Sequence, residues 1–502
     1  MERVSRRGVG SVGTVNRRGR VLAAITALLT MGSAALVGAS GARADTYETV
    51  IVTSSGALSP ATAVLNAGGT ILTQYTIING VLASVTTTEA GLLAATPGLT
   101  VTEDATVSVQ NSTVSTGPHT PSDAFLAQTG ATQLAQSGDT GQGVTVAVLD
   151  TGIDNLPDFS GRLIGGVDLS GEGHPFQDSY GHGTFVAGLI AGNGASSGGQ
   201  YSGEAPGANL VSVKVAGASG STDLGNLISG LQWVLNNRAT YNIKVINISL
   251  GYQPTKSTVN NPLDMAVERV WGGGIAVVAS AGNAGPFNGT ILSPGDDPLV
   301  ITVGALDDMA QTTVANDEMT DFSSVGPTSP DGWVKPDLVT SGRSVVSLAA
   351  PGSTVYNNHP SAIVGTANFV GSGTSFSAAI TSGAAALFLA NHVGDTPNQV
   401  KAALIASTNP GPVGNPFTDG HGALNAYGAD NVSSALNYNQ STDGLSPTAN
   451  GTTVSLSPIG STVDTWNGQS WNGQSWNGQS WNGQSWNGSA WSGQSWNGQS
   501  WN

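Results

Sequence analysis

Short, nearly unbroken apolar runs rich in β-branched residues recur between about residues 121 and 438. Runs of this kind are typical of strands in a parallel sheet whose two faces are both covered. Stretches with helical periodicity, such as Leu224–Asn236 and Pro262–Trp271, lie between them. The alternation predicts an α/β domain with a doubly wound, mainly parallel sheet flanked by helices. The runs are Val144–Leu149, Leu210–Val215, Val245–Leu250, Ile275–Ala279 and Val300–Val303.

The preceding segment, Thr46–Gln110, alternates strand-like runs with two short helical patterns. Asn79-Gly80 stands between two apolar runs, which is the signature of a β-hairpin. The segment therefore predicts a small, compact α+β unit. Residues 111–120 are polar and turn-rich, which indicates an exposed linker open to cleavage. The strand-like runs of the unit are Glu48–Val52, Ile71–Tyr75 and Val107–Val109.

The amino terminus has the three parts of an export signal. Six arginines precede the uncharged stretch Val21–Val37, and the small-residue site Ala42-Arg43-Ala44 follows it. This order predicts a secretory signal peptide over residues 1–44 and a secreted, extracellular protein. A retained membrane anchor is the alternative, which the short stretch rich in Ala and Gly disfavours. Arg17-Arg18 leaves twin-arginine export open beside the general secretory route.

Composition narrows the classes of function. The 502-residue chain has no cysteine, which excludes a disulfide framework, thiol catalysis and a cysteine-zinc site. It carries 16 basic and 32 acidic side chains. Removing residues 1–44 takes away seven arginines and Glu2, and leaves nine basic against 31 acidic side chains, a net charge of −22. Such a surface repels nucleic acid and anionic membranes, so we expect no nucleic-acid partner.

The last segment, residues 466–502, repeats the frame Trp-Asn-Gly-Gln-Ser with one Trp every five residues. That period gives no constant face on a strand or a helix. A flexible, solvated tail is the first interpretation. An array of aromatic rings that binds a polysaccharide or the cell wall, and a role in secretion, are the alternatives. Periodicity alone does not decide among them, and residues 439–465 are expected to link the tail to the preceding domain.

Three motifs contain residues suited to nucleophilic catalysis. A predicted buried strand ends in Asp150-Thr151-Gly152, at the edge of the sheet where α/β proteins build their sites. His182 stands between two glycines at the start of a predicted helix, and Ser375 precedes the Ala-rich helix 379–390. Each has a structural alternative, because Asp and Ser often cap helices and a lone His is usually structural.

Together these residues supply what a hydroxyl nucleophile needs. A neutral His takes the proton of a Ser near pH 7, and a carboxylate on the other ring nitrogen orients the ring and stabilises the imidazolium. Asn283 lies in a Gly-Asn-x-Gly turn after a predicted strand, either as a turn residue or as an amide donor to the oxyanion. A lipase or esterase would favour a Gly-x-Ser-x-Gly elbow and the order Ser, acid, His, which this sequence does not show.

The motifs in the order Asp150, His182, Ser375 resemble those of the subtilisin-like (subtilase) family of serine peptidases, over most of residues 45–438. The resemblance implies a monomeric serine endopeptidase over residues 119–438 that acts through an acyl-enzyme, with Asn283 as oxyanion donor. It also implies that residues 45–118 are a propeptide and linker that inhibits the enzyme, assists its folding and is removed by self-cleavage. The rival function is an inactive subtilase scaffold that binds cell wall or glycan through its Trp-rich tail, which requires a damaged triad or oxyanion donor that the sequence does not show.

The resemblance also implies which backbone binds the polypeptide substrate. Ser249-Leu250-Gly251 is similar to the family's substrate-binding strand, and Ser219-Gly220-Ser221 to the second edge that encloses the peptide. Ser280-Ala281-Gly282 matches the opposite wall of the primary specificity pocket. Because these walls carry no charge, we expect broad specificity with an apolar preference at the cleaved position.

Some positions depart from the family pattern. Phe185 stands where relatives commonly have a second His, and Ala379 replaces the usual Pro after the nucleophile. The segment Asn193–Gln200 is longer and richer in Gly and Ser than the calcium loop of many relatives, although Asp158 matches one of their calcium ligands. We expect no cofactor for catalysis, while the presence and the absence of a structural calcium ion both stay open.

Overall fold

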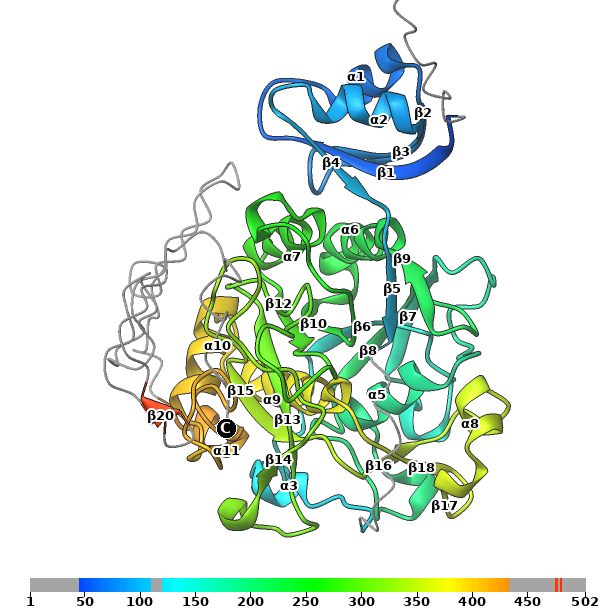
Figure 1. Cartoon of the computed structure of the whole chain (residues 1–502). Helices are drawn as coiled ribbons and strands as arrows, with labels where there is room; N and C mark the ends of the chain where they lie inside the picture. The colour runs from blue at the N-terminus through cyan, green and yellow to red at the C-terminus, as the bar shows by residue number, and fades with distance from the viewer. Residues whose placement is uncertain (1–44, 110–119, 433–474, 477–478, 481–502) are drawn as a thin grey trace, which may run out of the picture. The chain divides into compact units, whose positions relative to one another are not determined.

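The computed structural model describes residues 45–109, 120–432, 475–476 and 479–480 (Figure 1). The predicted signal peptide, the linker 439–465 and most of the Trp-rich repeat lie outside these residues. Within the repeat, the two-residue strands Ser475–Trp476 (β19) and Gln479–Ser480 (β20) pair antiparallel. Among the described residues, none of the helices has the length and hydropathy that crossing a bilayer requires.

The segment after residue 44 forms the predicted α+β unit. A four-stranded antiparallel sheet has the order β2-β3-β1-β4, and the hairpin between β2 and β3 turns at Asn79, whose φ is 44°. Val50, Val52 and Val81 belong to a separate small core under this sheet. The elements are β1 (Tyr47–Ser54), α1 (Pro60–Ala67), β2 (Thr70–Tyr75), β3 (Gly80–Thr86), α2 (Thr87–Ala94) and β4 (Leu99–Glu103).

An eight-stranded, mainly parallel sheet forms the centre of the larger domain, which confirms the predicted fold class. Every pair in it is parallel except the edge pair of β13 and β14. All five predicted apolar runs are strands of this sheet, because fully buried strands need apolar residues on both faces. The strands in spatial order are β14 (Glu318–Met319), β13 (Ile301–Asp307), β12 (Ala276–Ser280), β10 (Ile243–Ile248), β6 (Thr145–Asp150), β8 (Asn209–Lys214) and β7 (Leu163–Asp168), with β15 (Leu338–Ser341) beside β13.

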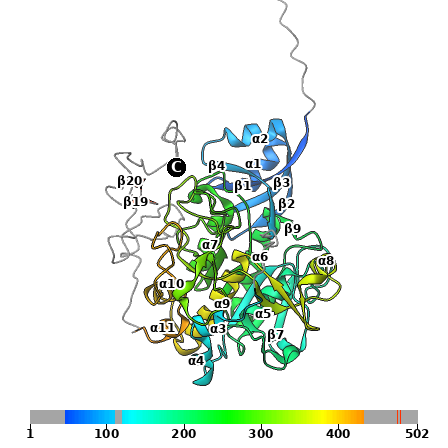
Figure 2. The ribbon, with the colours of Figure 1, turned by 60° about the horizontal axis from the view of Figure 1, so that its bottom comes forward.

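Helices cover this sheet in two packed groups. The helix α5 packs against α9, and both contact the sheet, while α6 packs against α7. The helices α6 and α7 lie side by side in both views (Figure 1, Figure 2). Capping explains where α7 begins, because Asn261 accepts a hydrogen bond from the Leu263 N–H and Pro262 opens the first turn. The large helices are α5 (His182–Ala191), α6 (Leu224–Tyr241), α7 (Pro262–Gly272), α9 (Thr374–Asn391) and α10 (Pro397–Ala406).

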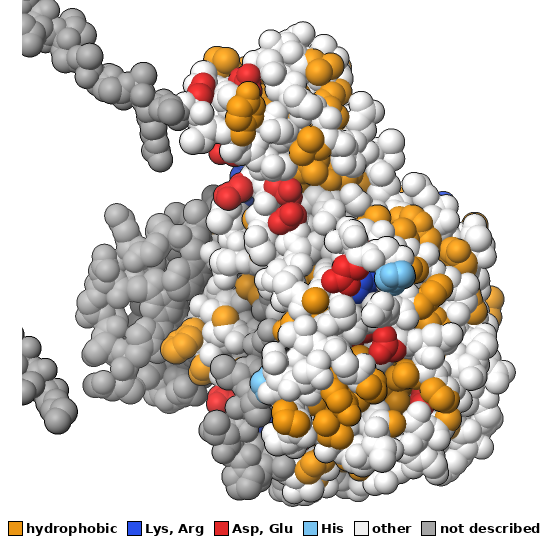
Figure 3. All heavy atoms as spheres, turned by 90° about the vertical axis from the view of Figure 1, so that its right-hand side faces the viewer, with side chains coloured by type: hydrophobic (Ala, Val, Ile, Leu, Met, Phe, Trp, Pro, Cys, Tyr) orange, Lys and Arg blue, Asp and Glu red, His pale blue; other side chains and the backbone are white. Residues whose placement is uncertain are grey.

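Shorter elements complete the larger domain. A second antiparallel sheet has the order β16-β18-β17. On the face drawn in Figure 3, acidic side chains appear at several places and basic ones at few, as the negative net charge predicts. The elements are α3 (Phe125–Gln128), α4 (Ala131–Gln136), α8 (Thr354–Asn358), α11 (Ala426–Asp430), β16 (Val345–Leu348), β17 (Ile363–Val364) and β18 (Asn368–Gly371).

The last predicted strand of the small unit is present, but it pairs outside the sheet of that unit. The strand β5 (Thr106–Val109) does not join the four-stranded sheet, but pairs antiparallel with β11 (Leu250–Gly251) on one side and β9 (Ser221–Asp223) on the other. Figure 1 shows β5 beside β9, away from the four-stranded sheet. Val107 and Val109 are buried there. The reason is that alternating apolar residues specify which face of a strand is buried, and leave open which strand it pairs with.

Candidate active site

Asp150 lies at the carboxyl end of β6, between β10 and β8 in the middle of the sheet. Its side chain is buried, and its two carboxylate oxygens lie 2.8 and 2.9 Å from the Nδ1 atom of His182. One of these oxygens also accepts a hydrogen bond of 2.8 Å from the Thr151 N–H. The carboxylate therefore faces an imidazole, and it does not cap a helix.

His182 is the first residue of α5, and glycines bring its backbone close to β6. A Cβ atom at Gly183 would lie 2.1 Å from the Gly152 carbonyl oxygen, so only glycine fits between the two motifs. Gly181 caps the helix with a φ of 108°, a conformation that glycine adopts without strain. The flanking glycines thus let the first turn of α5 approach the segment after β6 closely.

Asp178 is a buried residue near the site that lies outside the motifs discussed above. Its carboxylate accepts hydrogen bonds of 2.7 Å from the N–H groups of Gly181 and Thr184 and from the Thr151 hydroxyl. Burial raises the pKa of Asp178, while these hydrogen bonds oppose the rise. The residue ties the first turn of α5 to the segment after Asp150. Its place four residues before His182 is the sequence signal, since Asp is common just before a helix.

Ser375 lies in the first turn of α9, where Gly373 is the N-cap residue and no side chain caps the helix. The Ser375 hydroxyl donates to the Ser249 carbonyl at 3.3 Å, and the Ser249 hydroxyl donates to the Ser375 carbonyl at 3.1 Å. The next residue, Phe376, contacts the His182 ring with 5.6 Å between ring centroids. The Nε2 atom of His182 is buried and makes no hydrogen bond. The serine is therefore not a helix cap, and the residue after it packs against the imidazole.

Asn283 follows β12 and is anchored to the start of α9. Its Oδ1 atom accepts hydrogen bonds from the Thr374 N–H at 3.0 Å and from the Thr374 hydroxyl at 2.9 Å. Only the carbonyl oxygen of an amide can accept, so the amide nitrogen of Asn283 points away from Thr374. The side chain is held by the residue next to Ser375, a geometry suited to an amide donor at the nucleophile.

The two predicted substrate edges already enclose an extended segment, because β5 lies between them. Ser108 is opposite Gly251 on one side and Ser221 on the other. The Val109 N–H donates to the Gly220 carbonyl at 2.9 Å, and the Ser219 hydroxyl accepts a hydrogen bond of 3.2 Å from the Ser221 N–H. These two edges can pair with a third, extended chain by backbone hydrogen bonds.

The Leu292 side chain lies near both predicted walls of the specificity pocket. A Cβ atom added at Gly251 would lie 3.1 Å from Leu292, and one added at Gly282 would lie 2.8 Å from it. Ser249, Ser280 and Ala281 are buried in the same region. The Leu292 N–H donates to the Ala281 carbonyl at 3.0 Å, which fixes the leucine backbone against that wall.

The surroundings of Asp158 do not fit a calcium ion. Its buried carboxylate accepts hydrogen bonds from the N–H and the hydroxyl of Ser196. The guanidinium of Arg162 donates to the carbonyl oxygens of Ala191 at 2.7 Å and Ala208 at 2.9 Å, and to that of Asp158. The oxygens around Asp158, which are of the kind that calcium binds, therefore already accept hydrogen bonds from Ser196 and Arg162. Within residues 45–109 and 120–432, no group of three or more His, Asp or Glu side chains is arranged to hold a metal, and calcium at another site stays a prediction.

Comparison with known proteins gives consistent matches to one family. The profile of the subtilase family matches residues 141–429. The chain is 41% identical to the serine protease AprX of Bacillus subtilis (strain 168) over 303 residues, which is 59% of this chain and 68% of AprX. It is 35% identical to subtilisin NAT of Bacillus subtilis subsp. natto over 308 residues, 61% of this chain and 70% of that protein.

A solved structure supports the fold. The crystal structure of fervidolysin from Fervidobacterium pennivorans, described as a keratinolytic enzyme related to subtilisin, superimposes with a TM-score of 0.61 at 22% sequence identity. The match covers 77% of this chain and 61% of fervidolysin.

Proposed function

The chain belongs to the subtilase family and is a serine endopeptidase, and we propose that Ser375, His182 and Asp150 carry its chemistry. The observation that supports this most is the pair of contacts between the Asp150 carboxylate and His182 Nδ1 at 2.8 and 2.9 Å. They fix the tautomer in which Nδ1 carries the proton and Nε2 has a free lone pair. That is the tautomer in which an imidazole acts as a general base.

The reaction would proceed through an acyl-enzyme. His182 Nε2 takes the proton of the Ser375 hydroxyl while Oγ bonds to the carbonyl carbon of the peptide, and Asp150 stabilises the imidazolium. The imidazolium then gives that proton to the leaving nitrogen as the carbon–nitrogen bond breaks. Water, deprotonated by the same imidazole, releases the acyl group and regenerates Ser375. Asn283 would donate its amide N–H to the oxyanion that forms in each step.

Residues 45–118 act, in this proposal, as a propeptide that inhibits the enzyme and is removed by self-cleavage. Three contacts of the small unit with α6 support this role. The Tyr75 hydroxyl donates to the Gly225 carbonyl at 2.9 Å, the Gly225 N–H donates to Asp104 at 2.8 Å, and the Thr76 N–H donates to Gln232 at 2.7 Å. With β5 between both substrate edges, the segment would block access until it is cut, which makes the chain a zymogen.

The proposed product is an extracellular enzyme of broad specificity with an apolar preference. The export signal predicted over residues 1–44 and the net charge of −22 without them support secretion. Leu292 between the two uncharged walls supports the preference, because a charged side chain placed there would lose its water without gaining a partner.

We expect the purified enzyme to hydrolyse denatured protein, and peptide anilides with Ala or Leu at the cleaved position at least tenfold faster than those with Glu or Lys. A fluorophosphonate, which forms a covalent bond to activated serines, should label one peptide, the one that contains Ser375. Mass spectrometry of the digested, labelled protein locates the adduct. Label on a different serine, or a preference for a charged residue, would contradict the proposal.

Replacing Asn283 with alanine is expected to lower kcat by about 10²- to 10³-fold with little change in KM, because an oxyanion donor acts in the transition state alone. Asn283→Asp separates the two roles of the side chain. It keeps an oxygen that accepts from Thr374 and loses the amide donor, so it should be as slow as the alanine variant. Full activity of Asn283→Asp in steady-state kinetics would exclude the donor role, and Asn316→Ala, at an exposed position, serves as the control.

A further inference from the structure

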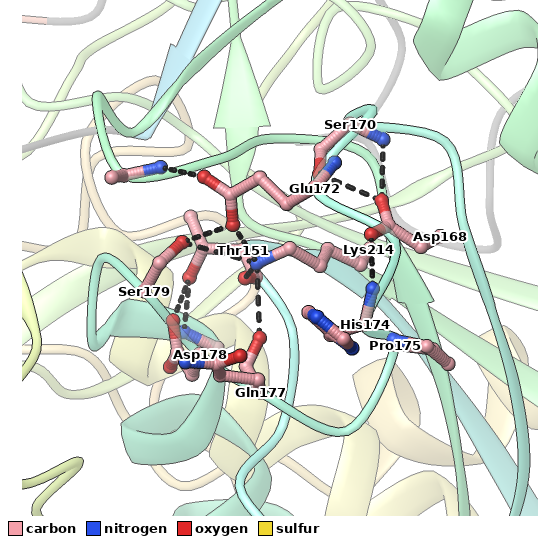
Figure 4. A network of polar contacts seen from close by, with 12 residues as sticks. Thr151, Asp168, Ser170, Glu172, His174, Pro175, Gln177, Asp178, Ser179 and Lys214 are labelled. Atoms are coloured by element: carbon pink, nitrogen blue, oxygen red, sulfur yellow. Dashed lines mark hydrogen bonds and ion pairs between the residues drawn. The ribbon is translucent and has the colours of Figure 1, made fainter.

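Glu172 joins three segments around the candidate active site (Figure 4). It lies in the loop between β7 and α5. Its carboxylate accepts hydrogen bonds of 2.8 Å from the Ala218 N–H and 2.6 Å from the Ser179 hydroxyl, and lies 3.0 Å from the Lys214 ammonium. Despite partial burial, these hydrogen bonds and the lysine hold the pKa of Glu172 below its usual value. The side chain is therefore an ionised acceptor at neutral pH.

The contact with Ala218 reaches the second substrate edge directly, since Ser219-Gly220-Ser221 follows it. A Cβ atom at Gly217 would lie 2.5 Å from a Glu172 oxygen, so the carboxylate rests on the backbone of residues 217–218. The Thr354 hydroxyl donates a hydrogen bond of 2.9 Å to the Ala218 carbonyl. The backbone that leads into this edge is thus held by hydrogen bonds through both its N–H and its carbonyl.

Lys214 fixes Glu172 in turn. Its side chain is fully buried, and its ammonium donates to the carbonyls of Thr151 at 2.7 Å and Gln177 at 2.9 Å and to the Ser179 hydroxyl at 3.2 Å (Figure 4). Lys214 stands opposite Asp150 in the pairing of β8 with β6. A buried ammonium needs an opposite charge nearby, and Glu172 supplies it. The glutamate is therefore held on the rigid sheet rather than on its own loop.

We propose that Glu172 is a positioning residue that holds the substrate edge 219–221 in the position at which it pairs with a peptide. The proposal rests on the proposed function, because it takes this edge as a binding surface for substrate. The pairing of β5 gives the reach of the effect, since Val107, Ser108 and Val109 lie opposite residues 220–222. A substrate contacts this edge only if it has several residues on the amino side of the cleaved bond.

The test compares a long and a short substrate of the mature enzyme. For a peptide anilide with four residues before the cleaved bond, Glu172→Ala is expected to raise KM about tenfold with kcat unchanged. For a substrate with a single residue there, both constants should stay as they are. Glu172→Gln keeps an oxygen that accepts from the Ala218 N–H and should restore most of the loss, while Glu172→Asp retains the charge for Lys214 but falls short of Ala218 and should not.

Asp168→Asn is the matched control, because Asp168 holds the same loop through Ser170 and His174 without touching residues 217–221. Equal losses for long and short substrates, or a fall in kcat with KM unchanged, would overturn the proposal, as would normal KM in Glu172→Asp. If Glu172→Ala does not fold, Glu172→Asp carries the same test. Absence of hydrolysis and of fluorophosphonate labelling in the unmodified enzyme would instead reject the proposed function.

Discussion

Replacing Ser375 with alanine is expected to abolish peptide hydrolysis and to leave residues 45–118 attached to the chain. Alanine removes the oxygen that, in the proposed mechanism, bonds to the substrate carbonyl carbon, and loss of a triad nucleophile lowers kcat by about 10⁶-fold in subtilisin. The unmodified chain should lose the small unit by its own action, with a cut shortly after Val109 in the segment predicted as an exposed linker, which lies outside the described residues. Amino-terminal sequencing and hydrolysis of a denatured protein measure both effects.

Ser377→Ala is the control for this experiment. Ser377 lies in the same helix, is also buried, and its hydroxyl donates to the Thr340 and Ser341 carbonyls at 3.1 Å. Its loss should cost stability and leave processing intact. A Ser375→Ala chain that still removes its own small unit and cleaves substrate at the normal rate would show that the nucleophile lies elsewhere.

The sheet could be predicted from sequence because its burial leaves a strong signal. Strands covered on both faces need mainly apolar residues on each face, so β6, β8, β10, β12 and β13 appear as nearly unbroken apolar runs. The partner of β5 could not be predicted in the same way. Its alternating valines fit any half-buried edge, and the choice of β9 and β11 depends on contacts between residues more than 100 positions apart.

The residues of the candidate site also differ in how far the sequence predicts their place. Asp150 ends a predicted strand, His182 and Ser375 lie at the start of predicted helices, and glycines mark where the backbone approaches closely. Asp178 and Glu172 act by accepting hydrogen bonds that join their own loop to other segments, at Thr151 and Ala218, which leaves no periodic signal in the sequence. The hydroxyl of Ser375 is a further case, because its donation to Ser249 depends on a rotamer that sequence does not specify.

Replacing Glu204 is expected to change strongly how the stability of the protein depends on pH. The Glu204 side chain is 1% exposed, and a Cβ atom at Gly383 of α9 would lie 2.5 Å from it. Burial raises the pKa of Glu204 from 4.5 to about 8, and the interaction with the Thr129 side chain opposes this rise. The folded protein therefore holds a proton between these pH values that the unfolded chain releases. This stabilisation is complete below pH 4.5 and is lost as pH rises through 8, a change of roughly 5 kcal/mol. Glu204→Gln should remove that part of the pH dependence.

The measurement is the free energy of unfolding at pH 5 and pH 9, in a Ser375→Ala background that prevents self-digestion. Other buried carboxyls, Asp297 among them, also have a raised pKa and lower the stability of both proteins as pH rises. The informative quantity is therefore the loss between the two pH values in the parent minus that in the Glu204→Gln variant. Glu318→Gln, at an exposed position, should leave the parent's loss unchanged. Equal losses in parent and Glu204→Gln would mean that Glu204 is already ionised in the folded core at pH 5, with water or a cation beside it.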